Sequence, residues 1–191
     1  EQHFRTPIFF HGTAGLRVLE PDLQSQILGT ICLYIKSKTD FFLPDCKSHI
    51  NIIDGDVEAL YSWISINYLK YQSIDIKDNT WGVLQLGGGS TQIGFELNEE
   101  KSLLTNQNFF NLQLLNQFNI YTDSFIKYGF NNFHQLYLQK LLNEDDDGYE
   151  ISDPCLPLKF HKSVQINNHN HKLIGLGDDS KCQLIINSMF Q

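Results

Sequence analysis

Three short segments of the chain carry residue types that suit chemistry on a phosphate group. They are residues 12–15 (GTAG), 54–58 (DGDVE) and 87–92 (GGGSTQ), and each follows an apolar run that is expected to be a strand. Backbone N–H groups in glycine-rich turns and at helix N-termini attract anions. A glycine-rich turn between two strands is more often only a turn, because glycine tolerates positive φ. Each segment taken alone therefore says little about phosphate binding.

Glu58 is the strongest candidate for a general base. It falls in the first or second turn of an expected helix, next to the apolar Val57. Ser62 and Ser65 lie on its own side, so Glu58 could face a polar cleft. The competing interpretation is a solvated glutamate at a helix N-terminus, where the helix dipole favours a negative charge. Periodicity alone favours this second interpretation.

Alternating strand and helix patterns must position these segments. Short β-type runs predict strands at residues 6–11, 50–53, 81–86 and 91–97, with two more between 108 and 125. Apolar residues at helical spacing predict helices that start at Pro21, start near residue 55, and run from about 130 to 142. Residues 81–97 are expected to form a hairpin around a glycine turn. The alternation is typical of an α/β protein.

The composition excludes several classes of protein. The 191 residues include 14 Lys or Arg and 22 Asp or Glu, for a formal net charge of −8. An acidic chain without a basic cluster releases few counterions from a phosphate backbone, so nucleic acid is not expected as a partner. The aromatic share of 13% argues against disorder. No apolar run approaches the roughly 18 residues of a membrane span, so we expect a soluble segment, without a targeting signal and excised from a longer protein.

The cysteines and two polar tracts leave alternatives open. Four cysteines allow three complete pairings, and Cys32, inside an apolar helical pattern, is interpreted as a small core residue. The acidic run 143–148 resembles the start of a calcium loop, but its twelfth position is Pro154 instead of Glu, which favours a solvated charge run. His169 and His171 have no third ligand nearby in the sequence, which disfavours a metal site there.

Taken in order, the three segments resemble the motifs of one enzyme family. Residues 12–19 (GTAGLRVL) resemble the second apyrase motif (ATAGMRLL). Residues 52–69 (IIDGDVEALYSWISINYL) resemble the third (IISGxEEGxYGWITxNYL), and residues 81–93 (WGVLQLGGGSTQI) resemble the fourth (GALDLGGASTQ). Similar family segments match residues 121–125, 128–129 and 153–155. The chain is therefore similar, over almost its whole length, to the nucleoside triphosphate diphosphohydrolases, the ecto-apyrase family.

The resemblance implies a fold. It is the two-lobed α/β fold of the actin, heat-shock-70 and hexokinase superfamily, with a nucleotide in the cleft between the lobes and only part of the fold present in this chain. Residues 1–54 would be the end of the first lobe and carry the second motif. Residues 55–191 would be the first part of the second lobe and carry the third and fourth motifs. The crossover would fall near Asp54, and the first and last motifs would lie outside the chain.

The resemblance also implies roles for individual residues. Glu58 would take the proton from the attacking water, and Ser90 and Gln92 would position that water. The residues implied to lie at the phosphates are Thr13, Ala14, Gly87, Gly88, Gly89 and Ser90. Phosphoryl transfer to water needs an in-line water, a positioned base and donors on the transferred oxygens, without a covalent nucleophile.

Gln85 is the main departure from the family pattern. The family has Asp there, and uses it to hold the water shell of a divalent cation, Mg²⁺ or Ca²⁺. An amide lacks the negative charge that a hard cation prefers, so Gln85→Asp is expected to raise cation-dependent hydrolysis if the site is weakened. Lys127 stands where animal members usually have Cys, whereas Cys155 and Cys182 match the positions of a family disulfide.

The function implied by the resemblance is metal-assisted removal of the terminal phosphate from nucleoside tri- or diphosphates. It would take place in the secretory lumen or outside the cell, with membrane anchoring only through segments outside this chain. The alternative is a catalytically weak or inactive nucleotide-binding member of the same fold, because of Gln85. A third and less favoured interpretation is another actin-fold phosphotransferase. Oligomeric state is left open.

Overall fold

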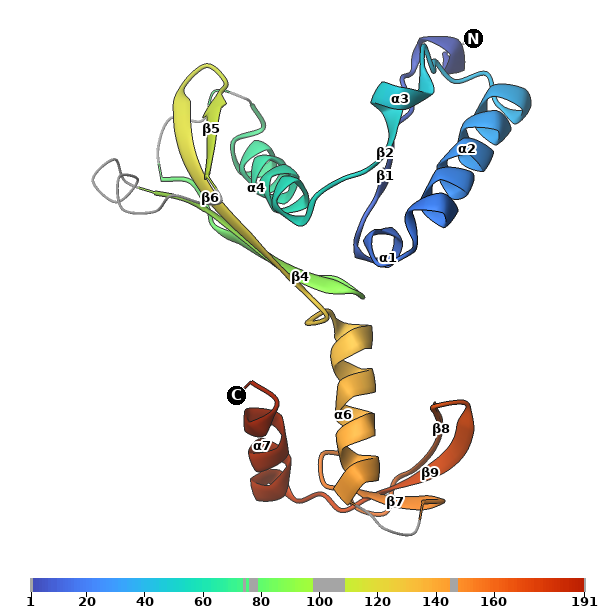
Figure 1. Cartoon of the computed structure of the whole chain (residues 1–191). Helices are drawn as coiled ribbons and strands as arrows, with labels where there is room; N and C mark the ends of the chain where they lie inside the picture. The colour runs from blue at the N-terminus through green and yellow to red at the C-terminus, as the bar shows by residue number, and fades with distance from the viewer. Residues whose placement is uncertain (1, 74, 76–78, 98–108, 145–147, 191) are drawn as a thin grey trace. The chain divides into compact units, whose positions relative to one another are not determined.

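The computed structural model describes residues 2–73, 75, 79–97, 109–144 and 148–190. The chain divides into two compact units, Glu1–Phe130 and Asn131–Gln191 (Figure 1). Within the described ranges, no helix combines the length and the apolar content that crossing a membrane requires.

The first unit opens with a parallel pair of short strands. Strand β1 (Phe10–Gly12) pairs with β2 (Ile50–Ile52), and Gly12 lies opposite Ile52. The segments that surround this pair are η1 (His3–Arg5), α1 (Ala14–Arg17), α2 (Pro21–Lys38) and α3 (Cys46–His49). Because parallel strands end at the same edge, the residues that follow β1 and those that follow β2 leave the pair side by side.

The larger part of the first unit is a helix on an antiparallel sheet. Helix α4 (Gly55–Tyr71) packs on a four-stranded sheet of order β3-β4-β6-β5. The strands are β3 (Val83–Leu86), β4 (Ser90–Glu96), β5 (Phe109–Gln113) and β6 (Gln117–Ile126). Trp63 of α4 is fully buried, and its ring lies 5.5 Å from that of Phe118. On β4 the buried face is the polar one, with Ser90 and Gln92 inside and Phe95 partly exposed.

The second unit packs two helices with a three-stranded sheet. Its elements are α6 (Phe130–Glu144), β7 (Glu150–Asp153), β8 (His161–Ile166), β9 (His169–Gly175) and α7 (Asp179–Ser188). In the sheet β9 lies between β7, which is parallel to it, and β8, which is antiparallel. The apolar core consists of Tyr137, Leu138, Leu141, Ile151, Ile166 and Leu173.

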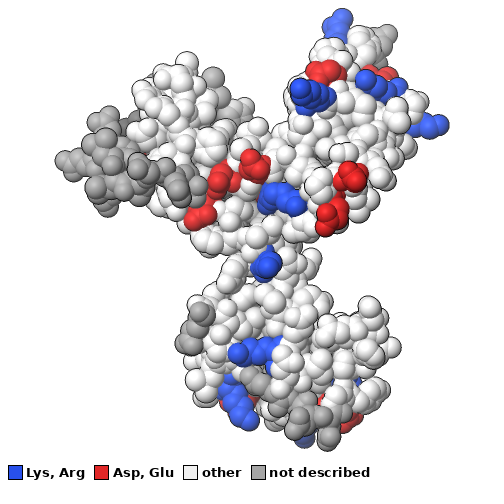
Figure 2. Space-filling view, in the orientation of Figure 1, with Lys and Arg blue, Asp and Glu red and all other residues white. Residues whose placement is uncertain are grey.

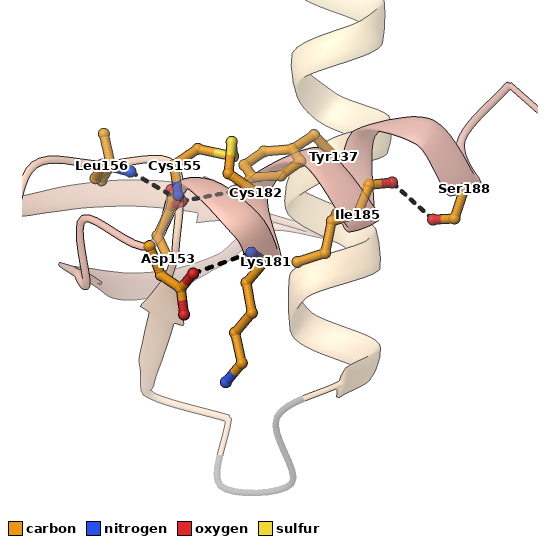
Figure 3. The surroundings of a disulfide bond; sticks show 9 residues. Tyr137, Asp153, Cys155, Leu156, Lys181, Cys182, Ile185 and Ser188 are labelled. Carbon is orange, nitrogen blue, oxygen red and sulfur yellow. Dashed lines mark hydrogen bonds between the residues drawn. A yellow bond between two sulfur atoms is a disulfide. The ribbon is translucent and has the colours of Figure 1, made fainter.

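The structure confirms most of the expected elements, and all of these except α6 belong to the first unit. The predicted helices correspond to α2, α4 and α6, and the predicted glycine-turn hairpin to β3 and β4. The interpretation of Cys32 as a small core residue is wrong, because Cys32 is bonded to Cys46 of α3. Cys155 and Cys182 are bonded as the resemblance implied (Figure 3).

The acidic run 143–148 and the two histidines at 169 and 171 lie in the second unit. The acidic run 143–148 lies partly outside the described residues, so the calcium-loop hypothesis stays untested. His171 is buried on β9 with Nδ1 against the Gly148 carbonyl, and the exposed His169 places Nδ1 3.0 Å from the Asn167 carbonyl. Both imidazoles therefore have backbone partners.

Candidate active site

Two loops that are far apart in the sequence touch in the first unit. Thr13 is the N-cap residue of α1, and Ala14 is buried directly after it. A Cβ added to Gly89 would lie 2.9 Å from the Ala14 Cβ, so the backbone of the glycine turn lies against α1. Only a residue without a side chain allows this approach without a shift. The segments around residues 13 and 89, both predicted to bind phosphate, therefore lie against each other.

The glycine turn is held in place by the segment after β6. The Lys127 amide donates to the Gly89 carbonyl at 3.0 Å. A Cβ on Gly129 would lie 2.3 Å from the Ser90 nitrogen, so these two backbones are in direct contact. Within the turn, the Gly87 amide donates to the Ser90 carbonyl at 2.9 Å. The Gly87 amide is therefore engaged by the hairpin itself and is not free for the phosphate contact that the resemblance implied.

Glu58 lies at the centre of a charged network. Both terminal nitrogens of Arg17 donate to Glu58 Oε2 at 3.1 Å. Arg17 also donates to the Ile53 carbonyl at 2.8 Å and to Ser90 Oγ at 3.3 Å. The side chains of Arg17 and Glu58 are only 14% and 12% exposed, so solvent screens this ion pair weakly. Basic and acidic side chains lie next to each other on this face of the first unit (Figure 2).

The other oxygen of Glu58 has a different partner. Gln85 Nε2 donates to Glu58 Oε1 at 3.2 Å, and Gln85 Oε1 accepts from Ser62 Oγ at 2.5 Å. Ser62 follows Glu58 by one helical turn, so both side chains lie on the same side of α4. Strand pairing places Gln85 opposite Gln92. Both ends of the Gln85 carboxamide are therefore bonded to α4.

Ser90 and Gln92 are buried behind this network. Ser90 is 2% exposed and Gln92 is 0% exposed. Gln92 Nε2 donates to Ser90 Oγ, and to Ser124 Oγ at 3.1 Å. Gln92 Oε1 has no hydrogen-bond partner in the described part of the protein. A buried acceptor of this kind is suited to bind a water molecule, which is the role that the resemblance implied for Gln92.

Further carboxylates lie around the N-terminus of α4. Burial raises the pKa of the Asp56 carboxyl, and the negative charges of Asp123 and Asp54 raise it further, while Arg17 opposes them. Burial also raises the pKa of Tyr121, whose hydroxyl donates to Asp123 at 3.3 Å. Burial is the first cause of both shifts, and the neighbouring carboxylates at this end of the helix add to it.

Gln85 fits the role of a cation ligand poorly. Its carboxamide oxygen accepts from Ser62 and its nitrogen donates to Glu58, and a neutral amide lacks the negative charge that a hard cation prefers. Across the described ranges, no group of three or more His, Cys, Asp or Glu residues could hold a metal ion.

The structure adds two residues that the sequence analysis gave no role. Arg17 joins Glu58 to Ser90, and Ser124 supports Gln92. A signal for Arg17 was present, because it is the basic residue of the segment 12–19. Ser124 stands in the family-like segment 121–125, but its type alone does not indicate a function.

Comparison with solved structures identifies the class of fold. The crystal structure of nucleoside triphosphate hydrolases from Neospora caninum matches 94% of this chain and 45% of that chain, with a TM-score of 0.72 at 17% sequence identity. The predicted actin-like α/β fold, present in part, is confirmed by this likeness. The sequence of the whole chain, residues 1–191, matches the GDA1/CD39 (nucleoside phosphatase) family. The chain belongs to this family.

Curated relatives agree with the assignment. The chain is 35% identical over 162 residues to the Golgi apyrase of Schizosaccharomyces pombe, which covers 80% of this chain and 28% of the relative. It is 30% identical over 200 residues to the nucleoside-diphosphatase mig-23 of Caenorhabditis elegans, covering 93% and 36%. With the mouse ectonucleoside triphosphate diphosphohydrolase 4 it shares 28% identity over 231 residues, covering 95% and 37%. The chain thus spans about a third of the length of these relatives.

Proposed function

We propose that this protein removes the terminal phosphate from nucleoside tri- or diphosphates, with Glu58 as the general base. The observation that carries the proposal is the buried Glu58 carboxylate, fixed by Arg17 and Gln85 beside the turn of residues 87–90. The relatives named apyrase, nucleoside-diphosphatase and ectonucleoside triphosphate diphosphohydrolase support the substrate class.

The proposed reaction is a direct attack of water on phosphorus. Glu58 takes one proton from the water as its oxygen bonds to phosphorus, and the bond to the leaving phosphate oxygen breaks. The Ser90 hydroxyl and Gln92 Oε1 orient the water. The turn around Gly88 and Gly89 binds the transferred oxygens, with Thr13 and Ala14 on the other side. Such a transfer depends on positioning and electrostatic stabilisation more than on covalent chemistry.

A divalent cation, Mg²⁺ or Ca²⁺, is part of the proposal. It would be held by phosphate oxygens and water and would neutralise charge on the phosphates. For the residues of this chain we propose that 1–54 belong to one lobe and 55–191 to the next, with the nucleotide bound near the three segments. Neither statement assigns a direct metal ligand.

An oxidising compartment is proposed for the protein. Two disulfides, Cys32–Cys46 and Cys155–Cys182, are typical of secreted or lumenal proteins. The names Golgi apyrase and ectonucleoside triphosphate diphosphohydrolase point the same way. We propose the secretory lumen or the cell exterior, with any membrane anchoring through segments outside this chain.

A second candidate function is nucleotide binding with little turnover. It is favoured by one observation, that an amide at position 85 takes the place of the motif carboxylate and is bonded to Glu58. Such a protein would bind nucleotides through the same loops and release phosphate slowly or not at all.

Phosphate release by the complete natural protein tests the proposal. Wild type and Glu58→Gln are compared on nucleoside tri- and diphosphates, with and without EDTA. We expect EDTA to stop the reaction, and Glu58→Gln to lower kcat roughly 10²- to 10⁴-fold with nucleotide binding kept. The exposed Glu96→Gln on β4 is the matched control. Near-normal turnover by Glu58→Gln would exclude Glu58 as the base, and binding without hydrolysis by the wild type would favour the second candidate.

A further inference from the structure

We propose that Gln85 is a positioning residue that orients the Glu58 carboxylate for proton abstraction, with Ser62 holding the far end of the Gln85 amide. The inference rests on the proposed function, because it gives position 85 a task in the same reaction. It replaces the expected task of that position, which was to hold the water shell of a cation.

The chemistry of the three groups fixes the direction of each hydrogen bond. An ionised carboxylate only accepts, so the end of Gln85 that lies 3.2 Å from Glu58 Oε1 must be the NH₂ group. The carbonyl end then faces Ser62 Oγ, which donates to it. The carboxylate of Glu58 thus decides which end of the amide it meets, and the Ser62 hydroxyl, which also lies 3.0 Å from the Glu58 main-chain carbonyl, holds the other end.

Gln85 and Arg17 hold different oxygens of the same carboxylate. Arg17 binds Oε2 with both terminal nitrogens, and Gln85 binds Oε1. The last torsion of a glutamate side chain is broad, so one ion pair would leave the carboxylate free to turn about it. Contacts to both oxygens from α1 and from β3 fix the plane of the carboxylate. A general base needs this control, because a small misplacement of the reacting atoms is costly in rate.

A carboxylate at position 85 would repel Glu58 instead of donating a hydrogen bond to it. It has no proton to donate, and it would place a second negative charge at hydrogen-bond distance from Glu58, where like charges repel. The two hypotheses for position 85 therefore predict opposite results for an isosteric acid. If the position serves a cation, Gln85→Glu raises activity or lowers the cation concentration required. If it positions Glu58, Gln85→Glu lowers kcat.

The experiment compares Gln85→Met, Gln85→Glu and Ser62→Ala in the complete natural protein, with steady-state kinetics at saturating Mg²⁺ and a Mg²⁺ titration. Gln85→Met keeps the size of the side chain and removes the donor. We expect its kcat to fall about 10- to 100-fold, as for a misplaced reacting group, with KM and the Mg²⁺ requirement unchanged. We expect the kcat of Gln85→Glu to fall further than that of Gln85→Met. Ser62→Ala shows a smaller loss, and the loss is absent when Gln85 is already Met, because Ser62 acts through Gln85.

Gln165→Met and Gln165→Glu, at an exposed strand position of the second unit, are the matched controls, and thermal unfolding is recorded for every variant. A Gln85→Met protein with unchanged kcat, or a Gln85→Glu protein with a higher rate or lower Mg²⁺ requirement, overturns this inference and leaves the proposed function intact. If Gln85→Met does not fold, an unchanged kcat in Ser62→Ala overturns it in the same way. A wild type as inactive as Glu58→Gln overturns the proposed function and this inference together.

Discussion

The two units bury polar groups in different ways. In the first unit Arg17, Glu58 and Gln85 come from segments 27 to 41 residues apart, and the network leaves Gln92 Oε1 without a partner among the described residues. In the second unit the buried carboxylate of Asp153 has partners close by in the chain. A buried polar group is expensive unless it is bonded, and the buried side-chain atoms without a partner among the described residues, Trp63 Nε1, Gln92 Oε1 and Thr122 Oγ1, all belong to the first unit.

In the second unit the buried Asp153 side chain holds neighbouring segments together. Asp153 Oδ1 accepts from the Tyr137 hydroxyl at 2.5 Å and from the amides of Cys155 and Leu156 at 2.8 and 3.3 Å. These contacts surround the disulfide between Cys155 and Cys182 (Figure 3). The loop that leaves β7 is thus tied to α6 by a hydrogen bond and to α7 by a covalent bond. The comparison predicts that changes in the second unit alter stability, whereas changes in the first alter stability and rate together.

The largest stability effect is expected for Arg17→Met. Removing one partner of this largely buried ion pair leaves the Glu58 charge unpaired, and the cost should approach the value of about 3–5 kcal/mol that is typical of a fully buried pair. Hydrogen exchange of amides in α4 measures the loss in the first unit. Adding Glu58→Gln to Arg17→Met should recover part of it, because the buried charge is then gone.

The matched control for Arg17→Met is Lys172→Met in the second unit. The pair Lys172–Glu150 is 38% and 51% exposed, so water screens it and its loss should cost much less stability than the loss of the Arg17–Glu58 pair. Equal effects of the two substitutions on unfolding free energy would show that burial does not distinguish the two pairs.

The next largest loss of stability is expected when both Cys155 and Cys182 are replaced by Ser. The bridge spans a sequence separation of 27, and loop-closure entropy gives it about 3–4 kcal/mol. Cys32–Cys46, with a separation of 14, should be worth slightly less, about 3 kcal/mol. Denaturant unfolding of the two double Ser variants measures both. Peptide mapping that finds the four thiols free in natively secreted protein would contradict the pairing itself.

A smaller effect is expected for Tyr137→Phe. The change removes one hydrogen bond to the buried Asp153 carboxylate, and bonds to charged groups contribute about 1.5–3 kcal/mol. Unfolding free energy is compared with that of Tyr149→Phe, at a tyrosine that is 65% exposed. If both variants lose the same stability, the Asp153 contact is not the reason.

The sequence predicted the first unit better than the second, and the reason is the pattern of apolar residues. Helices α2 and α4 have apolar positions at helical spacing, and the glycine turn marks the β3–β4 hairpin. Strands β8 (HKSVQI) and β9 (HNHKLIG) are mostly polar, so no strand was predicted there. A signal existed in Asn167 and Asn168, which adopt φ of 50° and 65° and form a two-residue hairpin turn of the type that asparagine favours.

The site was predicted only as a set of motifs. The order of the segments named Glu58, Ser90 and Gln92, but their contacts depend on tertiary packing. Arg17 and Gln85 reach Glu58 across 41 and 27 residues, and no local pattern predicts a contact of that range. Cys32 shows the same limit, because its partner lies on another helix. The roles assigned to these residues stay predictions until the variants are measured.

The smallest effect is expected for Asp56→Asn, and it should depend on pH. Burial and the charges of Asp123 and Asp54 raise the folded-state pKa of Asp56 above its ordinary value of 3.8. Between 3.8 and the raised pKa the folded state binds more protons than the unfolded state, so the contribution of Asp56 to stability falls as pH rises through this range. Above it, Asp56→Asn should be more stable than wild type by less than about 1 kcal/mol, because water screens a half-exposed group. Below pH 3.8 the two proteins should differ little.

Denaturant unfolding of wild type and Asp56→Asn across this pH range measures the difference. Asp45→Asn is a control of opposite sign, because hydrogen bonds from the Ser48 hydroxyl and amide lower the pKa of Asp45, so its contribution to stability is present at neutral pH and is lost on acidification. Toward neutral pH, Asp56→Asn should therefore raise the free energy of unfolding, and Asp45→Asn should lower it. A pH-independent gain from Asp56→Asn would mean that repulsion among the carboxylates is not its origin. Negative charge would then not be crowded at the start of α4, and the contrast between the two units would rest on the network of Arg17, Glu58 and Gln85 and on Gln92 Oε1, which is unpartnered among the described residues.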